Sequence, residues 1–127
     1  MAGVVGSMYD LFYNWPHPSE PSDAAQPRQQ AVGDALVTAY GTPQEDPSFW
    51  DSVSPINFVS DTSAWIQIDQ DVNDSQVPKL FSDHLDAVLQ AAGRNVEYDL
   101  YPGDDHQFIA NRAAILANTV AFFRAHL

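Results

Sequence analysis

Short apolar runs typical of β-strands alternate with segments of helical periodicity, and this alternation most constrains the fold of the chain. The strand-like runs lie at residues 3–8, 64–68 and 96–101. Parallel strands must be joined by long crossovers, usually helices, so the pattern predicts βαβ units. We therefore predict an α/β fold with about three parallel strands and three helices. At 127 residues, the chain fits a single domain spanning residues 1–127.

The helix between the second and third strands has the clearest signals. Pro78 suits a helix start, and Gly93 suits the turn that ends a helix. An expected core-facing stripe comprises Phe81, Leu85, Val88, Leu89 and Ala92. The residues expected to face water are Ser82, Asp83, Asp86 and Gln90.

The other two helices are predicted from similar signals. The first begins at Pro27 and ends before Gly41. The last is capped by Asn111, and its apolar stripe comprises Leu116, Thr119, Val120, Phe123 and Leu127. Proline-rich and polar segments at residues 13–30 and 42–61 are predicted to be a loop and an irregular segment.

The charge of the chain excludes several classes of partner. Seventeen acidic residues against five basic ones give a net charge of -12. A surface this acidic repels phosphate backbones and anionic lipids, so neither nucleic acid nor membrane is an expected partner. The absence of cysteine excludes a disulfide, a thiolate metal site and a cysteine nucleophile. We predict no metal and no cofactor.

Two residues are candidates for catalysis because of their place in the predicted sheet. Asp74 follows the second strand and His106 follows the third. Loops at the carboxyl ends of parallel strands form the ligand sites of open α/β sheets. A histidine acts as a general base when a carboxylate fixes its tautomer and stabilises the imidazolium. The pair therefore predicts a catalytic base, His106, oriented by an acid, Asp74.

The motifs around these residues resemble a known family. They are Ser54-Pro55, Asp74-x-x-Val77-Pro78, Tyr101-Pro102-Gly103-x-x-His106-x-Phe108 and the terminal Phe122-Phe123. Together they look like the C-terminal half of an α/β-hydrolase, and more narrowly they are similar to the prolyl-oligopeptidase-like (S9) serine hydrolases, with dienelactone hydrolases as near relatives. The resemblance implies that Asp74 is the orienting acid and His106 the general base of a Ser-Asp-His triad.

The nucleophile of such a triad is absent from the sequence. No serine has glycine two positions away on both sides, as the Gly-x-Ser-x-Gly elbow of this family requires. Ser7 follows Gly6, but Val5 and Tyr9 occupy the flanking positions. We therefore expect an N-terminal hydrolase segment, or another copy of the chain, to complete a site for a small ester or peptide substrate.

Two alternatives remain open. In the first alternative, the chain is a non-catalytic hydrolase remnant that binds a partner or itself through the open sheet edge at its N-terminal strand. Alternatively, Asp69-x-Asp71-x-Asn73 begins a calcium loop, although Asp74 stands where that motif has glycine. The resemblance also departs from the family here, because relatives usually carry His-Gly before the acid. Asp69 and Asp71 add negative charge that can disturb the position of Asp74.

Overall fold

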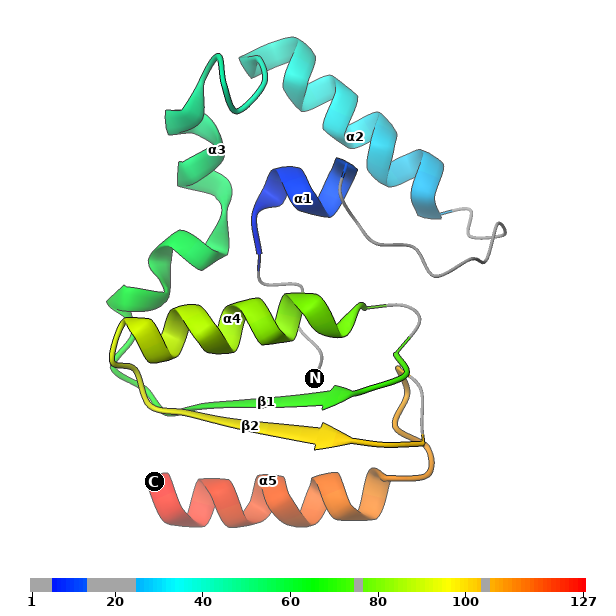
Figure 1. Cartoon of the computed structure of the whole chain (residues 1–127), viewed down its shortest axis with the longest axis vertical. Helices are drawn as coiled ribbons and strands as arrows, with labels where there is room; N and C mark the ends of the chain where they lie inside the picture. The colour runs from blue at the N-terminus through cyan, green and yellow to red at the C-terminus, as the bar shows by residue number, and fades with distance from the viewer. Residues whose placement is uncertain (1–5, 14–24, 75–76, 104–105) are drawn as a thin grey trace.

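The protein is described by a computed structural model, which covers residues 6–13, 25–74, 77–103 and 106–127. Helices form layers above and below a small parallel sheet (Figure 1). In chain order the elements are α1 (Met8–Tyr13), α2 (Ala25–Tyr40), α3 (Pro47–Val53), the 3-10 helix η1 (Pro55–Asp61), β1 (Ile66–Asp71), α4 (Lys79–Ala91), β2 (Val96–Tyr101) and α5 (Arg112–His126).

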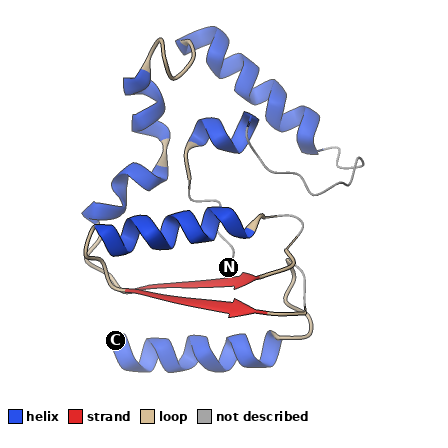
Figure 2. Cartoon of the chain, viewed as in Figure 1, coloured by secondary structure: helices blue, strands red, loops and turns tan. Residues whose placement is uncertain are grey.

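Within the described residues, the sheet consists of one parallel pair of strands. Strands β1 and β2 are in register from Ile66 opposite Val96 to Asp71 opposite Tyr101. Helix α4 is the crossover between them, and it covers one face while α5 covers the other (Figure 2). The α/β class is therefore confirmed.

The prediction of three strands is wrong in detail. Residues 3–5 of the expected first strand lie outside the described residues, and Met8 begins helix α1 instead of ending a strand. The open edge predicted at that strand is consequently not part of the described sheet, in which β1 and β2 each have one unpaired side. The second strand also continues to Asp71, three residues beyond the expected end at Ile68.

The core lies between α4 and the sheet. Ile68 of β1 packs with Leu85 and Leu89 of α4, and four partly buried side chains surround this cluster: Val59, Ile66, Val96 and Tyr98. Gly93 ends α4 with a φ of 65°, and the Arg94 amide donates to the Leu89 carbonyl at 2.9 Å. This six-to-one bond is the helix-ending motif that a glycine with positive φ permits. The predicted extent of α4 is confirmed.

Helices α1, α2 and α3 form a layer beyond α4; of these the sequence predicted only α2, whose expected extent from Pro27 to before Gly41 is confirmed apart from a start at Ala25. The segment 42–61 contains α3 and η1, so its prediction as irregular is wrong. Asp46 begins α3 because its side chain accepts a hydrogen bond from the Phe49 amide. Residues 25–30 are helical, not loop, and the remainder of that predicted loop at 14–24 lies outside the described residues. Within the described part of the chain, no helix is both long and apolar enough to cross a membrane.

Aromatic side chains join α1, α2 and α3. Tyr9 contacts Trp50 edge-on with ring centroids 5.3 Å apart, and Tyr40 stacks on Phe49 at 3.9 Å. Trp50 is buried and donates a hydrogen bond from Nε1 to the Gly41 carbonyl at 2.9 Å. These contacts explain why a segment with three prolines nevertheless folds: the aromatic burial, not helix propensity, stabilises it.

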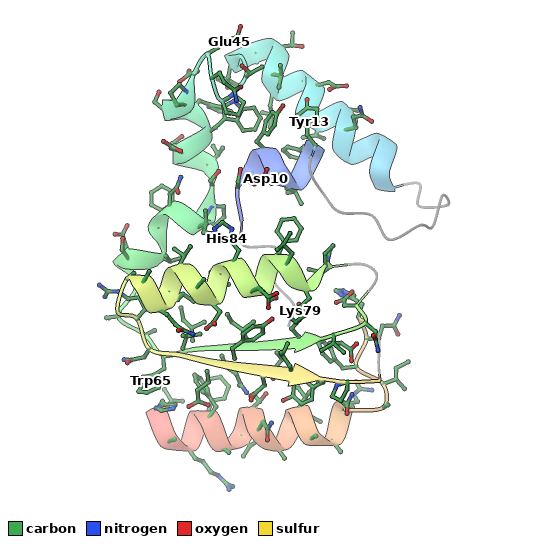
Figure 3. All side chains as sticks on the ribbon, in the orientation of Figure 1. Asp10, Tyr13, Glu45, Trp65, Lys79 and His84 are labelled. Atoms are coloured by element: carbon green, nitrogen blue, oxygen red, sulfur yellow. The ribbon has the colours of Figure 1, made fainter. Side chains whose placement is uncertain are left out.

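Helix α5 begins at Arg112, as predicted, but it packs through a different face. Phe122 is its buried residue, whereas the predicted core stripe is exposed at Leu116, Val120, Phe123 and Leu127. Trp65 stacks on His126 with ring centroids 3.7 Å apart, near the C-terminal end of α5 (Figure 3). The apolar stripe therefore does not identify the face that contacts the sheet, since this face of the sheet carries polar side chains.

We expect Leu89→Ala to lower the free energy of unfolding by about 3 kcal/mol, because Leu89 is fully buried and its removal leaves a cavity. Chemical denaturation monitored by circular dichroism measures the change. Leu80→Ala is the matched control, since Leu80 lies on the same helix and is 64% exposed. This control should stay within about 0.5 kcal/mol of the wild type. Equal losses in the two variants would contradict the assigned core.

Candidate functional site

Asp74 and His106 meet at the carboxyl edge of the sheet. Parallel pairing brings the ends of β1 and β2 side by side, at Asp71 and Tyr101. The loops that follow carry the two candidates, and His106 Nδ1 lies 2.9 Å from Asp74 Oδ2. Two residues separated by 32 positions in the sequence thus form a direct hydrogen bond. The structure brings together both predicted site residues.

The acid of this pair is held in a buried position. The side chain of Asp74 has no exposed surface, and its second oxygen, Oδ1, accepts a hydrogen bond from the Val77 amide at 2.8 Å. Its own amide donates to the Asp71 carbonyl at 3.3 Å, which closes a tight turn. A buried carboxylate requires such partners, because an unpaired one would be strongly destabilising. The orientation of Asp74 is therefore fixed by the backbone around it.

The chemistry of this contact determines the state of the imidazole. An ionised carboxylate only accepts hydrogen bonds, so the hydrogen must lie on Nδ1 of His106. In the neutral ring, Nε2 then carries the lone pair and can accept a proton. The His106 side chain is 33% exposed, whereas that of Asp74 is fully buried. A buried carboxylate thus contacts one nitrogen of an imidazole that is partly exposed.

The backbone bends sharply on both sides of His106. Gly103 has a φ of 81° and Phe108 a φ of 53°. A positive φ is unusual for an aromatic residue and costs free energy, so other contacts must maintain it. The Phe108 ring packs edge-on against Tyr101 with centroids 6.1 Å apart. This contact anchors the histidine loop to the end of β2.

Asn111 contributes to the same loop in a way that the sequence did not predict. It occupies the N-cap position of α5, but its side chain makes no capping hydrogen bond. Its Nδ2 instead donates to the Pro102 carbonyl at 3.2 Å. The predicted role of Asn111 as a side-chain cap is therefore wrong, since the side chain spans the histidine loop.

The acidic neighbours of Asp74 are directed into other contacts. The side chain of Asp69 accepts a hydrogen bond from the Tyr101 hydroxyl at 3.1 Å, on the face of the sheet that α5 covers. Asp71 Oδ1 accepts from the Asn73 amide at 2.7 Å. Burial raises the pKa of Asp69 above its ordinary value, and the hydrogen bond from Tyr101 only partly offsets this effect. The two added carboxylates thus coexist with a well-formed contact between Asp74 and His106.

Two residues that support the acid were not identified from the sequence. Gln70 is completely buried within β1, and Ser82 of α4, which was predicted to face water, is only 1% exposed. Ser82 Oγ donates to Gln70 Oε1 at 2.7 Å. The available signal for Gln70 was strand alternation, which places it on the same face of β1 as Ile66 and Ile68. No local signal identifies Ser82, because its burial depends on a partner in another element.

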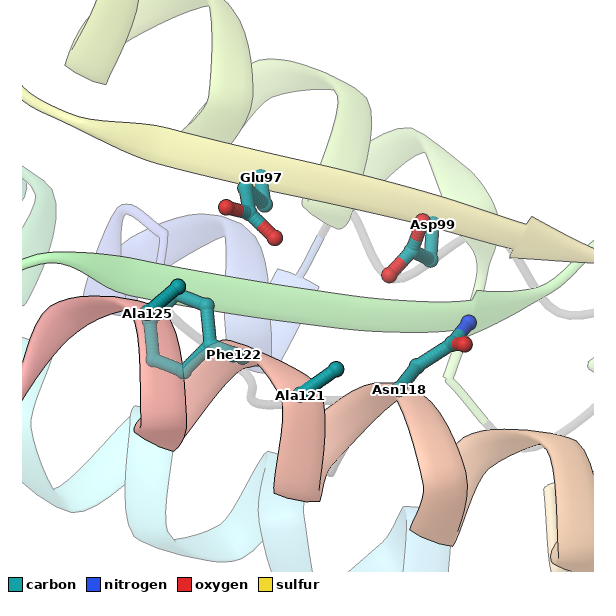
Figure 4. Close-up of a pocket in the computed structure, with 6 residues that line it drawn as sticks. All are labelled: Glu97, Asp99, Asn118, Ala121, Phe122 and Ala125. Carbon is teal, nitrogen blue, oxygen red and sulfur yellow. The ribbon is translucent and has the colours of Figure 1, made fainter.

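A pocket of about 320 Å³ lies between β2 and α5 (Figure 4). The residues that line it are Glu97, Asp99, Asn118, Ala121, Phe122 and Ala125. His126 Nε2 lies 2.8 Å from Glu97 Oε1, and Gln67 Nε2 donates to Asp99 Oδ2 at 3.4 Å. Neither Asp74 nor His106 lines this pocket, so it is separate from the acid and base.

The other predicted groups of the site take less specific positions. Ser7 precedes α1, and its Oγ accepts a hydrogen bond from the Asp10 amide at 3.4 Å. Among the residues that the structure describes, no serine hydroxyl is hydrogen-bonded to His106. Nor do three histidine or acidic side chains of that part of the chain gather as metal ligands would.

Comparisons with known proteins identify no relative by sequence: no family model matches the chain, and no curated protein matches it.

We expect Asp74→Asn to shift His106 from the Nδ1–H toward the Nε2–H tautomer, because an amide group can donate to Nδ1. The ¹⁵N chemical shifts of the imidazole, recorded at high pH where histidine is neutral, measure the tautomer. Asp83→Asn is the control, since it makes the same chemical change on α4, where Asp83 pairs with Lys79. A wild-type ring that is mainly Nε2–H would contradict the observed contact.

We expect Asp69→Asn to raise the melting temperature at neutral pH. The raised pKa means that the native state binds a proton more tightly than the unfolded chain, so stability falls as pH rises from the ordinary aspartate value, about 3.9, through the raised one. Asparagine has no charge to bury and keeps an oxygen that can accept from Tyr101.

The gain should be largest at neutral pH and should disappear below about pH 4, where Asp69 is protonated in both states. Calorimetry across this range measures it, with Asp61→Asn as the control at an exposed position. A lower melting temperature for Asp69→Asn at neutral pH would contradict the proposed cost of burial.

Proposed function

We propose that this chain supplies the general base and the orienting acid of a serine hydrolase, with the nucleophilic serine on a segment outside these 127 residues. The observation that carries the proposal is the 2.9 Å contact between His106 Nδ1 and the buried Asp74. This is the relation between base and acid that acyl-transfer catalysis requires. Such a site acts on the carbonyl group of a small ester or peptide.

In the proposed reaction, His106 Nε2 takes the proton of the serine hydroxyl as the serine oxygen bonds to the substrate carbonyl carbon. The imidazolium that forms is stabilised by Asp74 and returns the proton to the leaving alcohol or amine. An acyl-enzyme results. Water then attacks the acyl group, His106 again accepts and returns a proton, and the acid product and free serine are released.

The placement of both residues supports an origin in the α/β-hydrolase fold. The acid follows one strand and the base follows the next, after the crossover helix α4. This order is what the resemblance to prolyl-oligopeptidase-like hydrolases implies, and acid before histidine is the usual order of the fold. We propose that β1 and β2 are the last two strands of such a sheet.

The burial of the two strands indicates where the remaining strands would join. The last four residues of β1 are buried, whereas Tyr101 is the buried residue of β2. A strand that is buried along its length is typical of the inside of a sheet, and a more exposed one of its edge. We propose that the segment with the nucleophile pairs with the free side of β1.

We expect His106→Ala to reduce p-nitrophenyl ester hydrolysis by at least about 10³-fold, because the serine then lacks its base. The assay uses the native preparation, in which mass spectrometry establishes whether a nucleophile-bearing segment is present. His84→Ala is the control, because His84 is an exposed histidine on α4 and its loss should leave the rate unchanged.

A fluorophosphonate probe completes this test. It should label a serine of the nucleophile-bearing segment and no serine among residues 1–127. If the preparation hydrolyses the ester and His106→Ala leaves the rate at the wild-type level, the proposed function is wrong.

A second candidate is a non-catalytic remnant that binds a partner or a second copy of itself. The observation in its favour is the exposed apolar stripe of α5, formed by Leu116, Val120 and Phe123. Patches of this kind mark interaction surfaces when they are extensive. The hydrolysis experiment separates the two candidates: a preparation that contains the nucleophile-bearing segment but shows no turnover dependent on His106 favours the remnant.

A further inference from the structure

Gln70 is the residue from which an additional role can be argued. It has no exposed surface, although it is polar, and it is the last residue but one of β1. Its side chain is on the α4 side of the sheet, where Ile68 packs in the core and Ser82 lies within hydrogen-bonding distance. Burial of an amide is unfavourable unless it is hydrogen-bonded, so the contacts of Gln70 explain its place there.

Those contacts close both sides of the loop that carries Asp74. Gln70 Nε2 donates to the Asp71 carbonyl at 2.8 Å and to the Val77 carbonyl at 3.3 Å. The first carbonyl precedes Asp74 by three residues and the second follows it by three. One side-chain amide therefore links the end of β1 to the residue before the helix-starting proline.

The orientation of this amide is itself fixed. Ser82 Oγ donates to Gln70 Oε1 at 2.7 Å, and Ser82 is buried on the first turn of α4. The hydroxyl thus places oxygen on the α4 side and leaves both hydrogens of Nε2 for the loop carbonyls. If the amide were rotated by half a turn, Oε1 would face the carbonyl oxygens of Asp71 and Val77 and could not bond to them.

Val77 connects the hydrogen bonds of Gln70 to the carboxylate of Asp74. Its carbonyl accepts from Gln70, while its amide donates to Asp74 Oδ1 at 2.8 Å. The other oxygen of Asp74 contacts His106. A continuous series of hydrogen bonds therefore runs from Ser82 through Gln70, Val77 and Asp74 to His106.

We propose that Gln70 is a positioning residue that holds the Asp74 loop closed, so that Oδ2 stays against Nδ1 of His106. The catalytic meaning of this role rests on the proposed function, but the geometric role does not. Loss of the amide takes the Gln70 donor from the Val77 carbonyl and leaves the Asp71 carbonyl with the longer bond from the Asp74 amide, at 3.3 Å, so the two ends of the loop are no longer linked to each other. Opening moves the carboxylate and releases the imidazole from its fixed tautomer.

Gln70→Glu tests this role with little change in volume. A carboxylate can still accept from Ser82, but once ionised it cannot donate to the two carbonyls. At high pH, we expect the ratio of Nδ1–H to Nε2–H tautomer of His106 to fall about tenfold, as judged from imidazole ¹⁵N shifts. Gln70→Met, which removes all three bonds, should cause at least the same fall.

Leu85→Ala is the control for a general loss of stability. It removes a buried side chain from the core next to Ile68 and leaves every member of the hydrogen-bonded series from Ser82 to His106 in place. We expect it to lower the melting temperature but to leave the tautomer ratio unchanged. A folded Gln70→Glu variant that keeps the wild-type ratio would overturn the proposal.

Ser82→Ala decides the question if both Gln70 variants fail to fold. It removes only the bond that orients the amide, so the ratio should fall about threefold, and an unchanged ratio overturns the proposal. These measurements involve no substrate and no serine. If the positioning role of Gln70 is wrong, the tautomer ratio will show it. If the proposed function is wrong, hydrolysis will not depend on His106.

Discussion

The parallel pairing of β1 and β2, which the crossover helix α4 connects, is the constraint on which the site depends. It places Asp71 opposite Tyr101, so the loops that follow the two strands begin next to each other. A shift of register by one residue would exchange the faces of a strand, turning Ile68 away from Leu85 and Leu89 and bringing Asp69 toward α4. Apolar burial under α4 thus sets the register, and the register brings the acid to the base.

The two faces of the sheet contribute different properties. The face under α4 carries the apolar core together with the buried amide of Gln70, whereas the face under α5 carries Asp69 and Tyr101 in a hydrogen-bonded series that ends at Asn118. Burial raises the pKa of Tyr101 to about 12, so its hydroxyl stays protonated and can donate to Asp69. The apolar core cluster therefore lies on the α4 side, and polar contacts on the α5 side hold the end of β2, where the histidine loop begins.

The sequence predicted those features that local patterns determine. The predicted bounds of β2 agree with the structure, and Gly93 ends α4 as expected. Both predictions rest on signals within one element: the alternation of residues in a strand and a glycine at the end of a helix. The proximity of Asp74 and His106 followed from the rule that parallel strands share a carboxyl edge. The burial of Ser82 and the packing face of α5 depend on partners in other elements, so periodicity assigned both incorrectly.

Asp74 and His106 are held by different means, and this difference suits the roles of acid and base that we propose for them. Asp74 is buried and bonded to backbone within its own loop, so its charge is held in one place. His106 is bonded to that carboxylate on one side and partly exposed on the other, and the positive φ of Phe108 turns the chain away just beyond it. A base must reach a group that is not yet bound, whereas its orienting acid must not move during proton transfer. In the proposed site the fixed member of the pair is therefore Asp74, and its contact with Nδ1 leaves Nε2 of His106 as the nitrogen that would accept the proton.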